Sequence, residues 1–276
     1  MPTQQEAHIR ETQLILCGVI KLASTWEEKA ALWAAFSYLS EEIALTRTAV
    51  YIDGYNLYYG RLKGTPFKWL DIVEFSKNLL LHRSQNETLE FVHLFTAPAL
   101  ARFATHGQDS VIAQNSYIRA LETKHSALFK YTYGNHSVDR NGTPLPTYVQ
   151  NVPFDKNNRT KVWLIEEKKT DVNIAMEMYR DVSKGKCDRV ILISNDSDAE
   201  PVLKAISEDF PHVMIGAVFP IRPPQSPNQN RRASGSLANY ATWVKSSIDD
   251  LELQNAQLPP IVPKPNKKPI RKPTHW

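Results

Sequence analysis

Hydrophobic and polar positions alternate along the chain in a way that predicts strands and helices in turn from residue 48 onward. Apolar residues recur every three or four positions in the intervening segments, which is the spacing of amphipathic helices. Runs rich in β-branched and aromatic residues predict strands at 48–52, 89–96, 128–133, 189–193 and 213–219. Strands that alternate with helices are typical of an α/β fold, with a mostly parallel sheet covered on both faces.

Three segments depart from this alternation. Residues 1–47 have helical spacing throughout and predict a helical N-terminal extension. Residues 134–158 are rich in turn-forming residues and predict an inserted hairpin or a long loop. Residues 251–276 are rich in proline and lysine and predict a disordered, extended tail. Because 276 residues with 42% hydrophobic content can bury a sizeable core, we expect one large domain at 48–250 between the two flanking segments.

Charge and cysteine content narrow the class of protein. The formal net charge is +4, yet residues 259–276 carry five cationic side chains and no acid, so the rest of the chain is at −1. The two cysteines, Cys17 and Cys187, have no metal-ligand spacing and fit a reducing compartment. No apolar run is long enough to cross a bilayer. We therefore predict a cytoplasmic protein without a membrane partner.

Acidic residues follow two of the predicted strands. Asp53 comes directly after the run 48–52, and both Asp196 and Asp198 follow the run 189–193. Ligands of open α/β sheets bind outside the carboxyl ends of the strands, which is where these acids are expected. A fourth acid, Asp171, falls in the first turn of a predicted helix, where the helix dipole alone would account for it.

The stretch after residue 193 has two interpretations. Ser197 and Glu200 fit an S-x-x-E capping box, which explains both residues without any catalysis, just as Thr170 fits a helix N-cap. Asp196 and Asp198 remain unexplained, because crowded like charges repel one another unless a cation neutralises them. Carboxylate oxygens with no His/Cys set at ligand spacing favour Mg²⁺ or Mn²⁺.

The motifs IDGYN at 52–56, KTDVN at 169–173 and SNDSD at 194–198 together resemble the NYN domain family, the LabA-like branch of the PIN-like metal-dependent ribonucleases. The resemblance covers about residues 48–248. It implies a PIN-like three-layer sandwich with a mostly parallel five-stranded sheet of order 3-2-1-4-5. It also implies that Asp53, Asp171, Asp196 and Asp198 are catalytic and bind metal. Asn56 would orient the substrate or a metal-bound water.

By the same resemblance, the expected activity is endoribonuclease cleavage of RNA phosphodiester bonds with Mg²⁺ or Mn²⁺ as cofactor. Cationic side chains could hold backbone phosphates and an aromatic ring could stack on an unpaired base. The candidates for these contacts are Arg222, Arg231, Arg232, Lys168, Lys169 and Tyr55. A solvated basic loop explains the arginines nearly as well, and exposed lysines beside an acid are common.

Two other functions stay open at this point. The fold could serve as a non-catalytic RNA-binding or regulatory module, which would be indifferent to loss of the Asp196 charge. Alternatively, the acids could belong to a Mg²⁺-dependent phosphohydrolase of small molecules. The basic tail favours a polymeric substrate, because clustered cations add salt-sensitive attraction to RNA. Assembly into a homo-oligomer is also left open.

Overall fold

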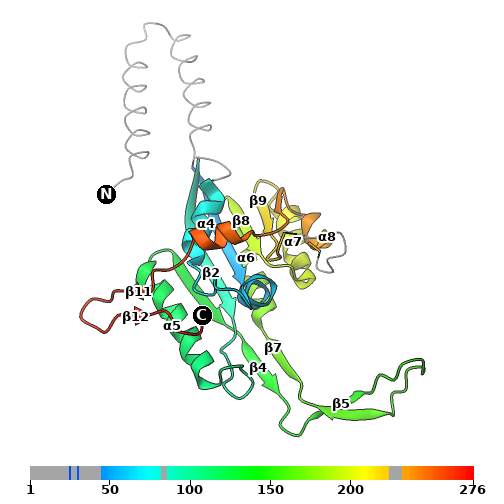
Figure 1. The fold of residues 1–276 in the computed structure, drawn as a ribbon. Coiled ribbons are helices and arrows are strands. Elements are labelled where there is room, and N and C mark those ends of the chain that lie inside the picture. Colours follow the sequence, from blue (N-terminus) through cyan, green and yellow to red (C-terminus); the bar gives the residue numbers. More distant parts are fainter. Residues whose placement is uncertain (1–24, 26–29, 31–44, 82–85, 224–231) are drawn as a thin grey trace.

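A parallel β-sheet forms the centre of the molecule. The computed structural model describes residues 25, 30, 45–81, 86–223 and 232–276. The strands of the main sheet are β1 (Thr46–Asp53), β2 (Glu87–Thr96), β3 (Phe129–Tyr133), β8 (Arg189–Ile193), β9 (Met214–Val218) and β10 (Trp243–Lys245). Their order is β10-β9-β8-β1-β2-β3, and each neighbouring pair is parallel (Figure 1).

The predicted α/β fold and strand order are confirmed, with one strand added. The five predicted strands are β1, β2, β3, β8 and β9, and they lie in the expected order. The sixth, β10, has only 3 residues and pairs with β9 at the sheet edge. Trp243 of β10 lies opposite Gly216, where an added Cβ would come within 2.9 Å of the indole ring. A strand this short gives no periodic signal in the sequence.

Helices cover both faces of the sheet. One face is covered by α4 (Ile72–Leu81) and α5 (Gln108–Lys124), and the other by α6 (Thr170–Ser183), α7 (Glu200–Asp209) and α8 (Gly235–Ala238). Successive side chains of a strand point to opposite faces. Val50 and Ile52 of β1 therefore pack in the first core, and Ala49 and Tyr51 pack in the second. This arrangement is the expected three-layer sandwich.

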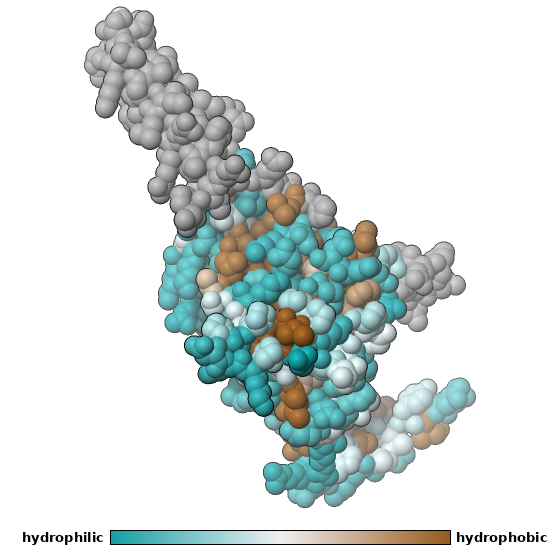
Figure 2. Space-filling view, turned by 60° about the vertical axis from the view of Figure 1, so that its left-hand side comes forward, coloured by the Kyte–Doolittle hydropathy of each residue, from teal (hydrophilic) through white to brown (hydrophobic). Residues whose placement is uncertain are grey.

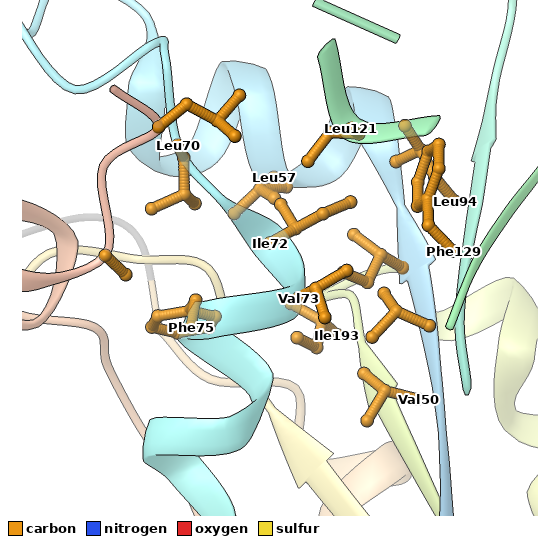
Figure 3. Close-up of a cluster of buried hydrophobic side chains, with 14 of the residues drawn as sticks. Val50, Leu57, Leu70, Ile72, Val73, Phe75, Leu94, Leu121, Phe129 and Ile193 are labelled. Atoms are coloured by element: carbon orange, nitrogen blue, oxygen red, sulfur yellow. The ribbon is translucent and has the colours of Figure 1, made fainter. Parts of the chain in front are cut away.

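The first core is built mainly from α4 and from the sheet. Ile72 and Val73 of α4 lie near the strand residue Ile193 (Figure 3), and Phe75 and Val50 belong to the same core. All five side chains are 0–1% exposed, so they are removed from water almost completely. Burial of this kind stabilises the fold by about 1.5–3 kcal/mol for each large aliphatic or aromatic side chain.

The chain after residue 249 folds back onto this core, and here the structure departs from the expected disordered tail. It forms α9 (Asp250–Asn255) and the antiparallel pair β11 (Ile261–Val262) and β12 (Ile270–Arg271). Its buried side chains are Leu253, Ala256, Leu258, Val262 and Ile270. Trp276 packs edge-on against the buried Trp69, with ring centroids 6.1 Å apart. A few well-placed apolar residues thus outweigh the proline- and lysine-rich composition.

The segment between β3 and α6 forms a long two-stranded projection (Figure 1). We call residues 135–168 the arm. Two antiparallel ribbons make it up, first β4 (Asn135–Val138) with β7 (Ile165–Lys168), then β5 (Thr143–Pro146) with β6 (Arg159–Val162). The predicted inserted hairpin is therefore confirmed, although its second half continues ten residues beyond the expected end at 158.

Most of the predicted N-terminal extension, 1–47, lies outside the described residues. The domain limits at 48–250 stay a prediction, although β1 begins at Thr46, close to the expected start. Within the part of the chain that the structure describes, no helix has both the length and the apolar character needed to cross a membrane.

Candidate metal centre

The register of the central strands brings the first and third motifs together. Ile52 of β1 pairs with Ile193 of the parallel strand β8, so Asp53 and Ser194 follow at the same edge of the sheet. β8 is fully buried, β1 is buried from Thr48 onward, and Asp53 itself is only 5% exposed. The chain then turns into α3 (Gly54–Leu57) after β1 and into the 3₁₀-helix η2 (Ser197–Ala199) after β8.

Three aspartates from three different elements converge at this edge. Asp53 ends β1, Asp196 follows β8, and Asp171 lies in the first turn of α6. One carboxylate oxygen from each lies within 4.8 Å of those of the other two. We call these residues the acid trio. Oxygen ligands of one divalent cation lie about 2.0–2.6 Å from the ion, so atoms at this spacing fit a shared metal.

The Ser194 hydroxyl links two members of the acid trio. Its Oγ donates to Oδ2 of Asp53 at 3.0 Å and accepts from the backbone N–H of Asp196 at 3.1 Å. Oδ1 of Asp53 accepts from the backbone N–H of Asn56 at 2.9 Å. Ser194 stands in the third motif, but nothing in the sequence distinguished its role from that of the neighbouring acids. It holds the Asp53 carboxylate and the backbone of Asp196.

Two asparagines hold the loop that carries Asp196. Oδ1 of Asn56 accepts from the backbone N–H of Asn195 at 3.1 Å. The Asn195 side chain in turn donates to the Arg232 carbonyl oxygen at 3.0 Å and accepts from the Ser234 N–H at 2.8 Å. The structure therefore gives Asn56 a contact that fixes the loop, and its expected role toward substrate or water stays a prediction.

Helix capping here differs from what the sequence pattern predicted. Asp196, rather than Ser197, is the N-cap of η2, and its Oδ1 accepts from the Asp198 N–H at 3.1 Å. The predicted Ser197/Glu200 box is absent, because Ala199 is the N-cap of α7 and makes no side-chain capping bond. The Glu200 N–H, which the box would have used, donates to the Ser197 backbone carbonyl oxygen instead. Asp198 is exposed and lies outside the acid trio.

The N-cap of α6 is also displaced by one residue. Lys169 occupies the N-cap with a left-handed backbone, φ 75°, and Thr170 is already helical. The Thr170 hydroxyl donates to the Glu167 carboxylate instead of capping the helix.

Burial and mutual repulsion make the trio's charges costly without a cation. Burial raises the pKa of Asp53 above its ordinary value, opposed by hydrogen bonds from Asn56 and Ser194 and reinforced by the charges of Asp171 and Asp196. Burial also raises the pKa of Asp171, with further contributions from the charges of Asp196 and Asp198. Carboxylates crowded in this way are stabilised by a divalent cation.

Glu167 of β7 is a fifth acid at the centre that the sequence reasoning missed. Burial, together with the charges of Asp53 and Asp171, raises its pKa to about 7, against the lowering effect of the hydrogen bond from Thr170. Glu167 reaches the centre because β7 pairs with β4, opposite His136. The signal that could have found it is the pairing across the arm, which brings the second half of the insertion back to the sheet edge.

Tyr55 and His136 lie beside this acid. Nε2 of His136 is 3.0 Å from the Tyr55 hydroxyl oxygen and 3.0 Å from the Pro98 carbonyl oxygen. The Tyr55 ring contacts Tyr59, with centroids 5.7 Å apart, and Tyr59 is 56% exposed. Burial raises the pKa of Tyr55, and the Glu167 charge adds to this shift. The predicted contact of Tyr55 with a base stays a prediction, yet its ring lies next to the centre.

We expect Glu167→Gln to flatten the pH dependence of stability in the metal-free protein. The folded-state pKa of about 7 lies above the ordinary value of 4.5, so Glu167 is protonated in both states below pH 4.5, and the fold loses stability progressively as pH rises from 4.5 to 7. Thermal unfolding in EDTA at pH 5, 6, 7 and 8 measures this. The wild type should lose more stability than the variant across that window. Parallel curves for the two proteins would contradict the expectation.

The cationic residues predicted to contact phosphates have different surroundings where the structure describes them. Lys168 pairs with Glu166 at 3.0 Å and is exposed, whereas Lys169 caps α6 next to Asp171. Arg232 is tied to the centre through Asn195, and Arg222 is exposed in the segment after β9. Arg231 lies outside the described residues. Roles in phosphate binding stay predictions for all of these residues.

Comparison with known proteins agrees with the motifs. A model of the NYN domain family matches residues 47–237. Over 243 residues the chain is 33% identical to 6-hydroxy-3-succinoylpyridine 3-monooxygenase HspA of Pseudomonas putida (strain DSM 28022 / S16), covering 83% of this chain and 75% of that protein. The chain is also similar to a Vibrio parahaemolyticus protein of unknown function in a crystal structure. That likeness has 14% identity and a TM-score of 0.42, and it covers 75% of this chain and 94% of the other.

Proposed function

Because the chain belongs to the NYN domain family, we propose that it is a metal-dependent ribonuclease that hydrolyses RNA phosphodiester bonds. The observation that supports this most is the convergence of the acid trio, whose oxygens lie within 4.8 Å of one another at the carboxyl edge of the sheet. The family match supports the fold and its relation to nucleases, and the acid trio supports metal binding at the proposed active site.

The acid trio would bind the metal ion, and Ser194 would position two members of the trio. Asp53, Asp171 and Asp196 would hold Mg²⁺ or Mn²⁺, and the nearby charge of Asp198 contributes to the raised pKa of Asp171. Bound there, the cation would supply an activated water and offset charge on the phosphate. Ser194 keeps the Asp53 carboxylate and the Asp196 backbone in register.

Glu167 is suited to move a proton in this reaction. With a pKa of about 7, its carboxyl exchanges a proton readily near neutral pH, as an effective general acid or base must. A nearby cation would lower that pKa and so favour the ionised form that accepts a proton from water. Glu167 hydrogen-bonds Thr170 next to Asp171, which keeps its carboxylate beside the acid trio.

A second candidate comes from the relative. Its name describes a monooxygenase of a 6-hydroxypyridine that carries a succinoyl group, and one third of aligned residues are identical. Under this alternative, the same edge of the sheet would bind a small hydroxypyridine, and one atom of O₂ would enter the ring while an external two-electron reductant converts the other atom to water. The trio's oxygen ligands favour the first candidate, because hard carboxylate sites are those at which Mg²⁺ and Mn²⁺ bind substrate phosphates.

Cleavage of end-labelled single-stranded and structured RNAs tests the proposal. We expect cleavage with Mg²⁺ or Mn²⁺, none with EDTA, and at least a hundredfold slower cleavage by Asp196→Asn with an unchanged circular dichroism spectrum. Glu208→Gln, which removes an exposed acid at the end of α7, is the matched control and should cleave normally.

Two parallel assays separate the alternatives. Oxygen uptake with a 6-hydroxypyridine substrate and reduced nicotinamide would favour the monooxygenase, and phosphate release from small phosphate esters would favour a small-molecule phosphohydrolase. RNA binding that is indifferent to both metal and Asp196→Asn would indicate a non-catalytic module. Any of these results, without metal-dependent RNA cleavage, would contradict the ribonuclease proposal.

A further inference from the structure

The distal arm exposes large apolar side chains that a two-stranded ribbon cannot bury by itself. Tyr148 is 86% exposed and Phe154 is 80% exposed. Other apolar side chains exposed along the arm are Leu145, Val149, Val152, Val162, Trp163 and Ile165. Figure 2 shows hydrophobic patches between hydrophilic ones along this projection at the lower right. Exposed apolar surface concentrated on one projection is typical of a binding surface.

The same part of the arm is positively charged. Residues 139–163 contain four cationic side chains and two acidic ones, which gives a net charge of +2. The cations are Arg140, Lys156, Arg159 and Lys161, all of them exposed. Within the described part of the chain, none of the four forms a salt bridge. Their charges are therefore available to an anionic partner.

An aromatic and cationic platform lies where the arm meets the domain. The Trp163 ring is 6.1 Å from that of Phe103, and the Arg102 guanidinium carbon stands 4.6 Å from the Trp163 ring centroid. Trp163 remains 52% exposed despite these contacts. An indole held in this way, with a cation beside it, offers a planar surface on which an unpaired base could stack.

The root of the arm is fixed to the candidate metal centre. Gly134, directly before β4, lies so close to α6 that an added Cβ would be 2.3 Å from Oγ1 of Thr170. His136 contacts Tyr55 and Pro98, and Glu167 on the partner strand accepts a hydrogen bond from Thr170, next to Asp171. The two strands that carry the surface described above are therefore anchored beside the acid trio.

The chemistry of the arm favours a nucleic acid over a second copy of the chain. A second copy is not a polyanion, because its net charge is +4 overall and −1 without residues 259–276, so it offers no excess of negative charge to match the four cations of the arm. Pro144 and Pro146 stand in β5 and remove the amide donors with which that strand could pair with another sheet. A polyanion with unpaired bases satisfies both the cations and the aromatic rings.

We propose that the arm binds single-stranded nucleic acid and holds the strand that enters or leaves the candidate metal centre. This inference rests on the proposed function, because it places the arm and the acid trio along one polymer. A single strand fits better than a duplex, since the flat faces of paired bases are hidden within the stack. From root to tip the arm offers a track on the order of 40 Å at the usual rise of a strand.

Fluorescence anisotropy with the full chain in EDTA tests this binding without cleavage. The probe is a labelled 20-nucleotide single-stranded RNA, compared with the same sequence in a duplex. We expect Tyr148→Ala/Phe154→Ala to weaken single-strand binding at least tenfold. The matched control, Ile112→Ala/Leu251→Ala, removes two exposed apolar side chains from α5 and α9 and should stay within twofold of the wild type.

Salt dependence tests the cations separately. For Lys156→Ala/Lys161→Ala we expect the slope of log K against log salt to become shallower by about 1.4, since each phosphate contact to a single strand contributes about 0.7. An unchanged slope would contradict a role for these lysines in phosphate binding. All these substitutions lie at exposed positions, so circular dichroism and thermal unfolding should match the wild type.

The results of these experiments distinguish failure of the arm proposal from failure of the ribonuclease proposal. If the wild type cleaves RNA and the aromatic double variant binds and cleaves as the wild type does, the arm proposal is overturned while the ribonuclease stands. If the aromatic variant loses binding but the wild type cleaves nothing, the arm proposal is supported and the ribonuclease fails. Equal affinity for duplex and single strand, or a dimer in sedimentation that the aromatic substitutions dissociate, would overturn the proposal.

Discussion

Asp53→Asn is expected to slow metal-dependent cleavage at least a hundredfold while raising the unfolding temperature of the metal-free protein. The loss follows because Asp53 supplies a carboxylate oxygen to the acid trio. The unfolding temperature should rise because Asp53 is only 5% exposed. Burial and the charges of Asp171 and Asp196 make its ionised form unfavourable, and asparagine carries no charge. In a chain of this size, each kcal/mol of relief raises the unfolding temperature by about 2–4 °C.

The stability advantage of Asp53→Asn over the wild type should increase with pH. A buried carboxyl with a raised pKa costs nothing while it is protonated in both states and destabilises the fold once it ionises. The stability advantage of Asp53→Asn in EDTA should therefore be largest at pH 8 and vanish toward pH 4. Thermal unfolding of both proteins across this range measures it.

The control for Asp53 is Asp198→Asn, an exposed acid near the same edge but outside the acid trio. We expect it to slow cleavage less than tenfold and to leave metal-free stability nearly unchanged. Added Mn²⁺ should raise the unfolding temperature of the wild type and of Asp198→Asn but not of Asp53→Asn. Cleavage by Asp53→Asn at the wild-type rate would rule out a role for this carboxylate in metal binding.

Ending the chain after Asp249 is expected to prevent stable folding. The truncation removes four large apolar side chains buried against the first core, Leu253, Leu258, Val262 and Ile270. At about 1.5–3 kcal/mol each, their burial is worth about 6–12 kcal/mol, comparable with the 5–15 kcal/mol that stabilises a typical domain. It also removes Asp250, the ion-pair partner of the buried Arg61. Circular dichroism and limited proteolysis of the truncated chain measure the effect.

Single substitutions give the same test in a folded protein. Ile270→Ala should lower the free energy of unfolding by about 2–4 kcal/mol, whereas Lys267→Ala/Lys268→Ala, at exposed positions of the same tail, should change it by less than about 0.5 kcal/mol. A truncated chain with a wild-type unfolding transition would show that the tail does not support the core.

Local signals in the sequence were sufficient to predict the scaffold and two acids of the trio. The apolar runs that became β1 and β8 each end in a motif with an aspartate, so the α/β fold and the expected place of Asp53 and Asp196 followed from position alone. Asp171 needed the family resemblance, because the dipole of α6 explains an acid there equally well.

Features that depend on distant parts of the chain could not be predicted. Glu167 reaches the centre only because β7 pairs with β4 across the whole arm. Ile270 looks like an isolated apolar residue among lysines and prolines until it is seen packed in the first core. In both cases the deciding contact lies far along the chain, where a window of ten or twenty residues does not reach.

The order of strands has a consequence for how the protein is made. The central strand β1 lies near the start of the described domain, whereas its neighbour β8 follows late, and the bonded pair Asp53 and Ser194 are separated by 141 positions. A growing chain on the ribosome therefore carries Asp53 long before Asp196 exists, and the segment after residue 249 that covers the first core follows later still. The candidate centre can assemble only after Ser194 and Asp196 have been made, so ribosomal RNA beside a shorter nascent chain meets no assembled acid trio.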